Sequence, residues 1–194
     1  PKQHVVWAHL ADAYIGQAGV KSGAEQDAAM NKGLEMYLKA LELKPEEAAY
    51  HNNYALALAR AKKFNEAQAE LQKAAQIDPP NAGRYYYNLG ALLVNSGQAD
   101  PALDAFKKAI EADPNYADAH YQIGMALLGK ASLSPEGKVV APPGTREALQ
   151  KYLELKPTGP FAESAKGSLD LLEKSIETQY LSPEAQKKAA KKKK

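Results

Sequence analysis

The chain has 194 residues, of which 45% are hydrophobic and 25% charged, and this composition suits one domain or a short repeat array. It has no cysteine, which excludes disulfide frameworks, thiolate zinc sites and cysteine nucleophiles. The net charge of +2 comes from six lysines within residues 187–194, because the rest of the chain carries 19 basic and 23 acidic residues. No apolar run approaches the ~20 residues of a membrane span. Helix-forming Ala, Leu, Glu, Lys and Gln dominate, so the chain is expected to be all-α.

A sequence motif typical of an amphipathic helix occurs four times along the chain. Its copies are WAHLADAY from Trp7, HNNYALAL from His51, YNLGALLV from Tyr86 and HYQIGMAL from His120. In the third copy, Tyr86, Leu89 and Leu93 form one apolar face around Gly90. This pattern predicts a helix with a notch where a neighbouring helix approaches closely.

A second sequence motif follows each copy of the first and ends in proline. Its copies are LKALELKP to Pro45, LQKAAQIDP to Pro79, FKKAIEADP to Pro114 and LQKYLELKP to Pro157. Small, large and small residues alternate in it, as in Ala102, Phe106 and Ala109, so its large side chains fit the notches of the first helix. Proline cannot continue a helix, and the unit is therefore an antiparallel hairpin that must stack on others to cover its apolar face.

These spacings predict an array over residues 1–180, with repeats at approximately 4–45, 46–80, 81–115 and 116–157. The first repeat holds about ten extra residues at 16–25, which predict an enlarged inter-helix loop. The last repeat holds an insertion at 131–144 with three prolines and the pair Val139–Val140. That insertion is either a strand-like docking element or a stiff detour between helices, and the detour is favoured.

A further helix is expected after Pro157. Its apolar stripe comprises Phe161, Ala165, Leu169, Leu172 and Ile176. A terminal repeat needs such a cover, so residues 160–180 are predicted to be a capping helix. Residues 181–194 are predicted to be a flexible Lys-rich tail, either a solvated end, which is favoured, or a contact for polyanions.

The 34-residue period, Trp7-x2-Leu10-Ala11-x2-Tyr14, Ala102-x3-Phe106 and the closing prolines resemble the tetratricopeptide-repeat (TPR) family over residues 4–157. The resemblance implies a right-handed α-α superhelix, a TPR solenoid of four helix-turn-helix repeats plus the C-terminal capping helix. The compact sequences of the repeats resemble those of bacterial members of the family. Substitutions of two kinds depart from the family pattern at four positions: histidine replaces the aromatic residue at 51 and 120, and alanine replaces glycine at 11 and 55. Each keeps a compatible size.

The residues that suggest chemistry are accounted for by repeat packing. His51 and His120 occupy an aromatic position and are expected to pack between helices. His4 and His9 are five residues apart, so they do not share a helix face as paired metal ligands do. Glycine-rich phosphate loops and nucleophile elbows are absent from the sequence. We therefore expect no enzyme activity, no cofactor and no metal.

The resemblance implies that the first helix of each repeat lines a concave groove for a peptide or a partner's helix. The register gives ten partner-binding positions in this groove: Asp12, Asn52, Leu56, Arg60, Arg84, Tyr87, Val94, Asn95, Tyr121 and Met125. Tyrosine and arginine often anchor interfaces, and methionine adapts to varied shapes. Asn53 and Asn88 are expected to support helix packing instead. A carboxylate clamp of the kind that some members have is incomplete here.

The sequence thus predicts a non-catalytic protein–protein interaction scaffold that binds a partner segment in its groove. The alternatives are a structural subunit of a larger bacterial assembly, or an accessory TPR domain of a longer chain. The body has no basic stripe, so no specific nucleic acid is expected as a partner. The start at Pro1 indicates N-terminal trimming, and the compartment is then either the bacterial cytoplasm or the periplasm or envelope after loss of a signal. The residues do not name the partner.

Overall fold

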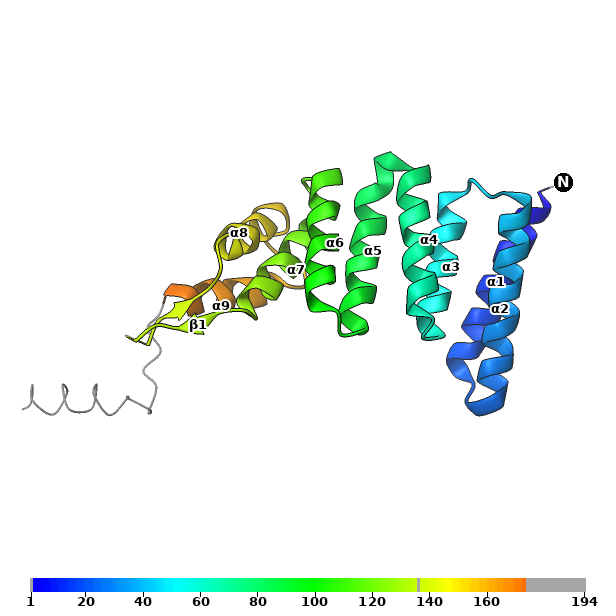
Figure 1. Ribbon diagram of the computed structural model, residues 1–194, viewed down its shortest axis with the longest axis horizontal. Coiled ribbons are helices and arrows are strands. Elements are labelled where there is room, and N and C mark those ends of the chain that lie inside the picture. Colours follow the sequence, from blue (N-terminus) through cyan, green and yellow to red (C-terminus); the bar gives the residue numbers. More distant parts are fainter. Residues whose placement is uncertain (1, 136, 174–194) are drawn as a thin grey trace, which may run out of the picture. The chain divides into compact units, whose positions relative to one another are not determined.

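The computed structural model describes residues 2–135 and 137–173 (Figure 1). These residues belong to two compact units that divide within one helix: the first unit ends at Gln122 and the second begins at Ile123. Each unit is described by itself below. The parts of the chain predicted as the end of the capping helix, residues 174–180, and as the Lys-rich tail, residues 181–194, lie outside the described residues.

The first unit consists of helical hairpins. Its elements are α1 (Gln3–Val20), α2 (Gly23–Leu43), α3 (Ala48–Arg60), α4 (Phe64–Ile77), the 3-10 turn η1 (Pro79–Asn81), α5 (Ala82–Asn95), α6 (Ala99–Ala112) and the first part of α7 (Ala117–Leu128). The second helix of each hairpin ends two residues before the proline that the sequence marks, at Leu43, Ile77 and Ala112. The predicted hairpins α1/α2, α3/α4 and α5/α6 are confirmed (Figure 1).

The expected enlarged loop at residues 16–25 is wrong. The structure continues α1 to Val20 and begins α2 at Gly23, so the extra residues lengthen both helices and only Lys21 and Ser22 connect them. Ala18 is fully buried in the added turns, and the Gln26 Nε2 donates a hydrogen bond to the Ala18 carbonyl at 3.2 Å. This local packing offsets the cost of the helical Gly16 and Gly19, about 1 kcal/mol each.

The third hairpin shows how the helices of a repeat approach one another. Gly90 on α5 faces the ring of Phe106 on α6, and a Cβ at position 90 would lie 2.5 Å from the Phe106 Cδ1. Phe106 is 1% exposed, and Ala102 and Ala109 on the same helix face are also buried. The notch predicted at Gly90 is therefore filled by the large side chain of the partner helix, as close packing requires.

Two of the inter-helix turns share one backbone design. The Gln98 amide donates to the Leu93 carbonyl at 2.8 Å and the Gly97 amide to the Val94 carbonyl, which is a Schellman ending with Gly97 at φ 76°. After α3 the same pair of bonds recurs, with Lys63 donating to Leu58. There Lys62 occupies the left-handed position at φ 60°, a conformation that favours glycine.

The second unit contains the end of α7, the strands β1 (Ser132–Leu133) and β2 (Val139–Val140), α8 (Thr145–Leu155) and α9 (Ala162–Glu173). The strands pair antiparallel, with Ser132 opposite Val140 and Leu133 opposite Val139. The insertion at 131–144 thus carries two paired strands between α7 and α8, which agrees with the strand-like alternative and does not contradict a detour between the two helices. Whether it docks a partner stays a prediction.

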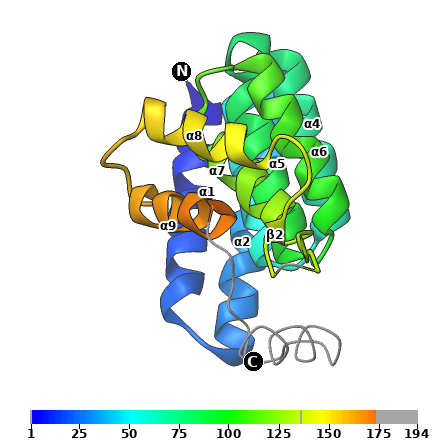
Figure 2. The ribbon, with the colours of Figure 1, turned by 90° about the vertical axis from the view of Figure 1, so that its left-hand side faces the viewer.

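In this second unit, α9 packs beside α8 and β2 (Figure 2). Ala162, Ala165 and Ser168 of α9 are buried, and the Ser168 hydroxyl points to the Met125 sulfur of α7 at 3.6 Å. The Phe161 amide donates to the Tyr152 hydroxyl at 3.0 Å, which fixes the start of α9 on α8. The helix lies within the range predicted for the cap. None of the helices in the described residues is long and apolar enough to cross a membrane.

Candidate partner-binding surface

Most of the groove positions that the register predicts in the first unit are open to solvent. Exposed positions come from α1, α3 and α5: Asp12, Leu56, Arg60, Arg84, Val94 and Asn95. Leu56 is 41% exposed and Val94 is 52% exposed, so both present apolar side chains to solvent among charged neighbours. A mixed surface of this kind is typical of transient protein interfaces.

A pocket of about 190 Å³ brings three of these residues together. Its lining residues come from α1, α2 and α3: Asp12, Ile15, Tyr37, Asn53, Leu56, Ala57 and Arg60. Ile15, Leu56 and Ala57 make an apolar wall, while Asp12 and Arg60 supply one negative and one positive charge. The pocket is therefore suited to a group that is partly apolar and partly polar.

Tyr37 connects the second helix of the first hairpin to this pocket. Its hydroxyl donates a hydrogen bond to the Asp12 Oδ1, and its ring is only 2% exposed. Burial, followed by the bond to the Asp12 carboxylate, raises the pKa of Tyr37 well above its ordinary value, although Asn53 and the Arg60 guanidinium act in the opposite direction. The phenol consequently stays protonated at neutral pH and holds the carboxylate in one orientation.

Three asparagines continue this polar chain from α3 to α5. The Asn52 Nδ2 donates to the Asn53 Oδ1 at 3.0 Å, and the Asn88 Nδ2 donates to the Asn52 Oδ1 at 2.8 Å. The predicted packing role is confirmed for Asn88, which joins α5 to α3, whereas the bond of Asn53 lies within α3. The expectation that Asn52 is exposed is wrong, because Asn52 is 6% exposed and its amide is held by these asparagines between neighbouring repeats.

Tyr87 lies on an aromatic cluster. Its ring centroid is 5.0 Å from that of Tyr116 and 5.7 Å from that of Phe106, so two neighbours hold a half-buried side chain. Arg84 precedes it by one turn and donates to the Tyr85 hydroxyl at 3.2 Å, while Tyr85 donates to the Asp78 carboxylate. Arg84 and Tyr87 thus have defined positions on α5, although neither lines the pocket beside Asp12.

The last two predicted positions differ from the expectation of an exposed groove. Tyr121 on α7 is buried, with 9% of its surface exposed. Met125 belongs to the second unit, is half-buried, and lies against Ser168 of α9. Met125 therefore contributes to packing between α7 and α9 within its own unit.

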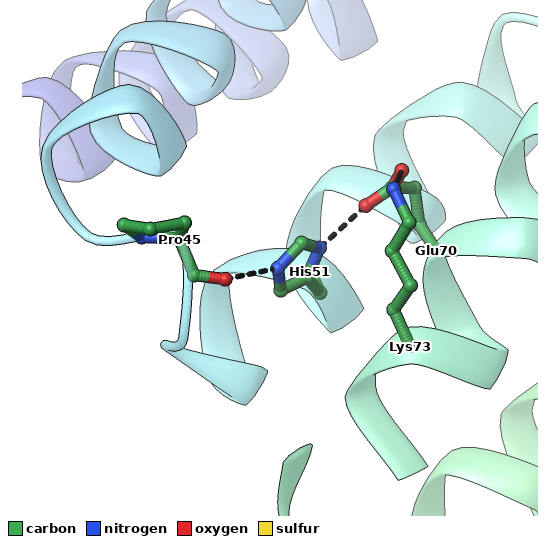
Figure 3. A network of polar contacts seen from close by, with 4 residues as sticks. All are labelled: Pro45, His51, Glu70 and Lys73. Atoms are coloured by element: carbon green, nitrogen blue, oxygen red, sulfur yellow. Dashed lines mark hydrogen bonds and ion pairs between the residues drawn. The ribbon is translucent and has the colours of Figure 1, made fainter. Parts of the chain in front are cut away.

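The buried histidine of the second repeat is held by hydrogen bonds (Figure 3). The His51 Nε2 donates to the Pro45 carbonyl at 2.7 Å, and its Nδ1 lies 2.5 Å from the Glu70 Oε2 on α4. The Lys73 Nζ donates to the other Glu70 oxygen at 2.8 Å. Burial raises the pKa of Glu70, but the bonds from Lys73 and His51 outweigh it and leave that pKa below its usual value.

His120 repeats one of these contacts. Its Nε2 donates to the Pro114 carbonyl at 2.8 Å, six residues earlier, as His51 does to Pro45. The expectation that His51 packs between helices is confirmed, since it is buried and reaches Glu70 on α4, whereas for His120, which is half-exposed, it stays a prediction. Among the described residues, no group of three or more His, Cys, Asp or Glu side chains is arranged to hold a metal ion.

Two residues of this surface are missing from the register prediction, Tyr37 and Tyr116. The register considered first helices only, whereas Tyr37 lies on a second helix. A signal existed: Tyr37 stands eight residues before the closing proline, where other repeats have Leu71, Phe106 and Leu149. A hydroxyl at a position that is otherwise apolar indicates a polar partner at the ring tip. Tyr116 lies in a turn, which carries no helical register.

Stacked antiparallel hairpins with glycine notches, closing prolines and an open surface on their first helices define a helical-repeat protein. The chain carries tetratricopeptide repeats, because tetratricopeptide-repeat models match residues 46–115 and 105–137. The two matches lie in the same region where the proline spacing is 34 and 35 residues.

Curated relatives match parts of the chain. A small glutamine-rich tetratricopeptide repeat-containing protein 2 from Mycosarcoma maydis is 35% identical over 82 residues, which are 42% of this chain and 23% of that protein. The Hsp70-Hsp90 organizing protein of Triticum aestivum is 28% identical over 139 residues, 72% of this chain and 22% of that protein. The chain thus spans about a quarter of the length of these two relatives.

Solved structures show the same fold. MamA matches with a TM-score of 0.60 at 19% identity, over 97% of this chain and 94% of that one. A thermophilic TPR protein of Thermus thermophilus matches with a TM-score of 0.58 at 23% identity, over 66% of each chain. The first TPR of Spaghetti (RPAP3), solved with an HSP90 peptide, has a TM-score of 0.51 at 19% identity, over 65% of this chain and 92% of that one. The fold is an all-α TPR solenoid.

Proposed function

We propose that the first unit binds an extended or helical segment of a protein partner on the surface formed by α1, α3 and α5, and that the chain is non-catalytic. The observation that carries this proposal is the pocket beside Asp12, Leu56 and Arg60, whose polar groups are held in place by buried partners. An interface needs such ordered anchors, because a side chain that is already fixed loses little entropy on binding.

The relatives support the same role. The first TPR of Spaghetti is bound to an HSP90 peptide, which shows a peptide on a domain of this fold. The exposed apolar residues Leu56 and Val94 and the clustered Tyr87 supply contact area, and Arg60 and Arg84 supply charge-assisted hydrogen bonds at its margin. Asn52 and Tyr121 act through packing in this proposal, because both are buried.

The chain offers a matched pair of variants for a test. Leu56→Arg places a charge in the pocket wall, and Leu38→Arg places the same charge at a position of similar exposure on α2, 46% against 41%, which does not line the pocket. Partners are to be identified by crosslinking and mass spectrometry with the full chain, and their affinity measured by calorimetry. Leu56→Arg is expected to weaken binding at least about tenfold, as loss of an interface anchor does, and Leu38→Arg to leave it unchanged. Equal affinities for both variants and the unaltered chain contradict the proposal.

A further inference from the structure

The pocket beside Asp12 holds two opposite charges that do not neutralise one another directly. Asp12 comes from α1 and Arg60 from the end of α3, and both line the pocket. Within the described residues, the Arg60 nitrogens and the Asp12 carboxylate oxygens do not approach to 4.0 Å, so the two side chains form no ion pair. The Arg60 guanidinium lowers the pKa of Tyr37, the residue whose hydroxyl donates to Asp12. Because Asp12 and Arg60 line the same pocket, a group bound in it has access to both charges.

The carboxylate of Asp12 is oriented before any ligand arrives. The Tyr37 hydroxyl occupies its Oδ1, which leaves Oδ2 as the acceptor for a ligand. Asn53, which lines the pocket, is itself bonded to Asn52, and Asn52 to Asn88 on the next repeat. The acceptor thus stands beside a hydrogen-bonded chain anchored between two repeats. An arrangement of this kind is a built site rather than a chance gathering of surface charges.

The volume of the pocket indicates which kind of ligand fits it, a small-molecule cofactor or one amino-acid side chain. Its volume of about 190 Å³ is smaller than the ~300–1,000 Å³ of typical small-molecule sites. One amino-acid side chain with its apolar stem fits such a space, and Ile15, Leu56 and Ala57 form the wall against which that stem packs.

The opposite charges of Asp12 and Arg60 limit the type of partner side chain that the pocket can bind. An ammonium attracted by Asp12 is repelled by Arg60, and a carboxylate attracted by Arg60 is repelled by Asp12. A purely apolar side chain removes water from both charged groups without replacing its hydrogen bonds, which costs free energy. A carboxamide offers an NH₂ donor to Asp12 and a carbonyl acceptor to Arg60. It presents both from one end, whereas the N–H and C=O of a trans backbone amide point in opposite directions.

We propose that the Asp12–Arg60 pocket is a specificity subsite for a neutral carboxamide side chain, Asn or Gln, of the bound partner segment. The inference rests on the proposed function, because it names the chemistry of one position in the segment that this surface binds. Tyr37 is a positioning residue of the subsite and acts through Asp12.

The test uses the full chain and a phage-displayed library of random 12-residue peptides. Peptides that bind the unaltered chain and the Leu38→Arg variant but not the Leu56→Arg variant define the pocket-dependent set. Asn or Gln is expected to be enriched at one position of this set. Synthetic peptides with Gln, Glu, Lys or Leu at that position then give affinities, and replacement of Gln is expected to weaken binding about 5- to 100-fold, as an unpaired buried polar group does.

Charge-removing variants reverse the preference in opposite directions. With Asp12→Asn the pocket retains only the cation, so the Glu peptide is expected to bind best. With Arg60→Gln it retains only the anion, so the Lys peptide is expected to bind best. Arg60→Lys keeps the positive charge and is the matched control, with the preference for Gln retained. Thermal unfolding followed by circular dichroism verifies that each variant is folded.

The outcomes separate the two proposals. Pocket-dependent peptides without enrichment of Asn or Gln overturn the carboxamide subsite and leave the proposed function standing. A Gln preference that neither Asp12→Asn nor Arg60→Gln changes also overturns the subsite. A library that yields no peptide sensitive to Leu56→Arg overturns both the subsite and the peptide-binding function.

Discussion

The ring of Phe106 occupies the space into which a side chain at Gly90 would project. A Cβ there would lie 2.5 Å from the Phe106 Cδ1, and the ring is 1% exposed and unable to move aside freely. Gly90→Ala is therefore expected to lower the free energy of unfolding by up to about 2 kcal/mol, because overpacking costs roughly 1–3 kcal/mol and the better helix propensity of alanine offsets about 1 kcal/mol of that cost. Urea denaturation followed by circular dichroism measures the difference.

The control for this variant lies in the same unit. Gly16 is inside α1, and nothing lies within 4 Å of a Cβ built at that position. Gly16→Ala has the same change in composition without the collision, so it is expected to stabilise the helix by about 0.5–1 kcal/mol. If both variants change the free energy of unfolding in the same direction, the close contact between Gly90 and Phe106 does not limit the size of the residue at position 90.

Lys62 and Gly97 occupy equivalent left-handed positions after α3 and α5, at φ 60° and 76°. Lysine has a steric cost in this region that glycine avoids. Lys62→Gly is therefore expected to raise the free energy of unfolding by about 0.5–1 kcal/mol, and Gly97→Ala to lower it by about 1 kcal/mol. Thermal and urea unfolding of the two single variants check these opposite signs, and a loss of stability in Lys62→Gly contradicts the Schellman interpretation of that turn.

The sequence predicts the hairpins of the first unit well, because the signals that define them are local. Pro45, Pro79 and Pro114 end helices by steric exclusion, and the notch at Gly90 faces the large residue that repeat spacing assigns to it. The extra residues at 16–25 mislead, because Gly16, Gly19 and Gly23 suggest a loop. Only the burial of Ala18 in the hairpin shows that packing overrides the glycine propensity.

The candidate site is predicted only in part, for a related reason. Register identifies Asp12, Leu56 and Arg60 because first helices share one periodicity. It does not identify Tyr37, whose hydroxyl reaches Asp12 across a hairpin. It also assigns Asn52 to the open surface, since spacing carries no information on the bond that Asn52 accepts from Asn88. Contacts between helices and between repeats decide both cases.

Glu70 links α4 to α3 through His51, and its carboxylate also pairs with Lys73. Because its folded pKa is lowered, the stabilisation it provides is fully present above the ordinary pKa of 4.5 and is lost as pH falls through the folded value below it. Glu70→Gln is expected to cost about 1.5–3 kcal/mol at pH 7, as loss of charged hydrogen bonds does, and less in acid. Urea denaturation at neutral and acid pH measures both values.

The control for Glu70 is an exposed carboxylate on the same helix. Glu66 pairs with Lys63 at 3.6 Å, and its side chain is 56% exposed against 14% for Glu70. Surface pairs of this kind contribute about 0–1 kcal/mol, so Glu66→Gln is expected to change stability little at neutral pH. A Glu66→Gln variant as unstable as Glu70→Gln contradicts the assignment of the stabilisation to the His51 network.

The raised pKa of Tyr37 makes the stability of the first unit depend on pH in the alkaline range. Its folded pKa is raised by burial and by Asp12, so the folded state holds the phenol proton more tightly than the unfolded state, whose tyrosines titrate near 10.0. The stabilisation is present below pH 10 and is lost as pH rises through the folded pKa. Tyr37→Phe removes the phenol and is expected to make stability fall less steeply above pH 10 than in the unaltered chain. Urea midpoints at neutral and alkaline pH measure this slope, with phenolate absorbance as a second readout.

Tyr54 provides the control for this prediction. Burial also raises the pKa of Tyr54, but Tyr54 has no hydrogen bond to Asp12, so Tyr54→Phe is expected to reduce the slope less than Tyr37→Phe does. Equal slopes in the two variants contradict a special contact between Tyr37 and Asp12, and with it the oriented carboxylate on which the carboxamide subsite depends.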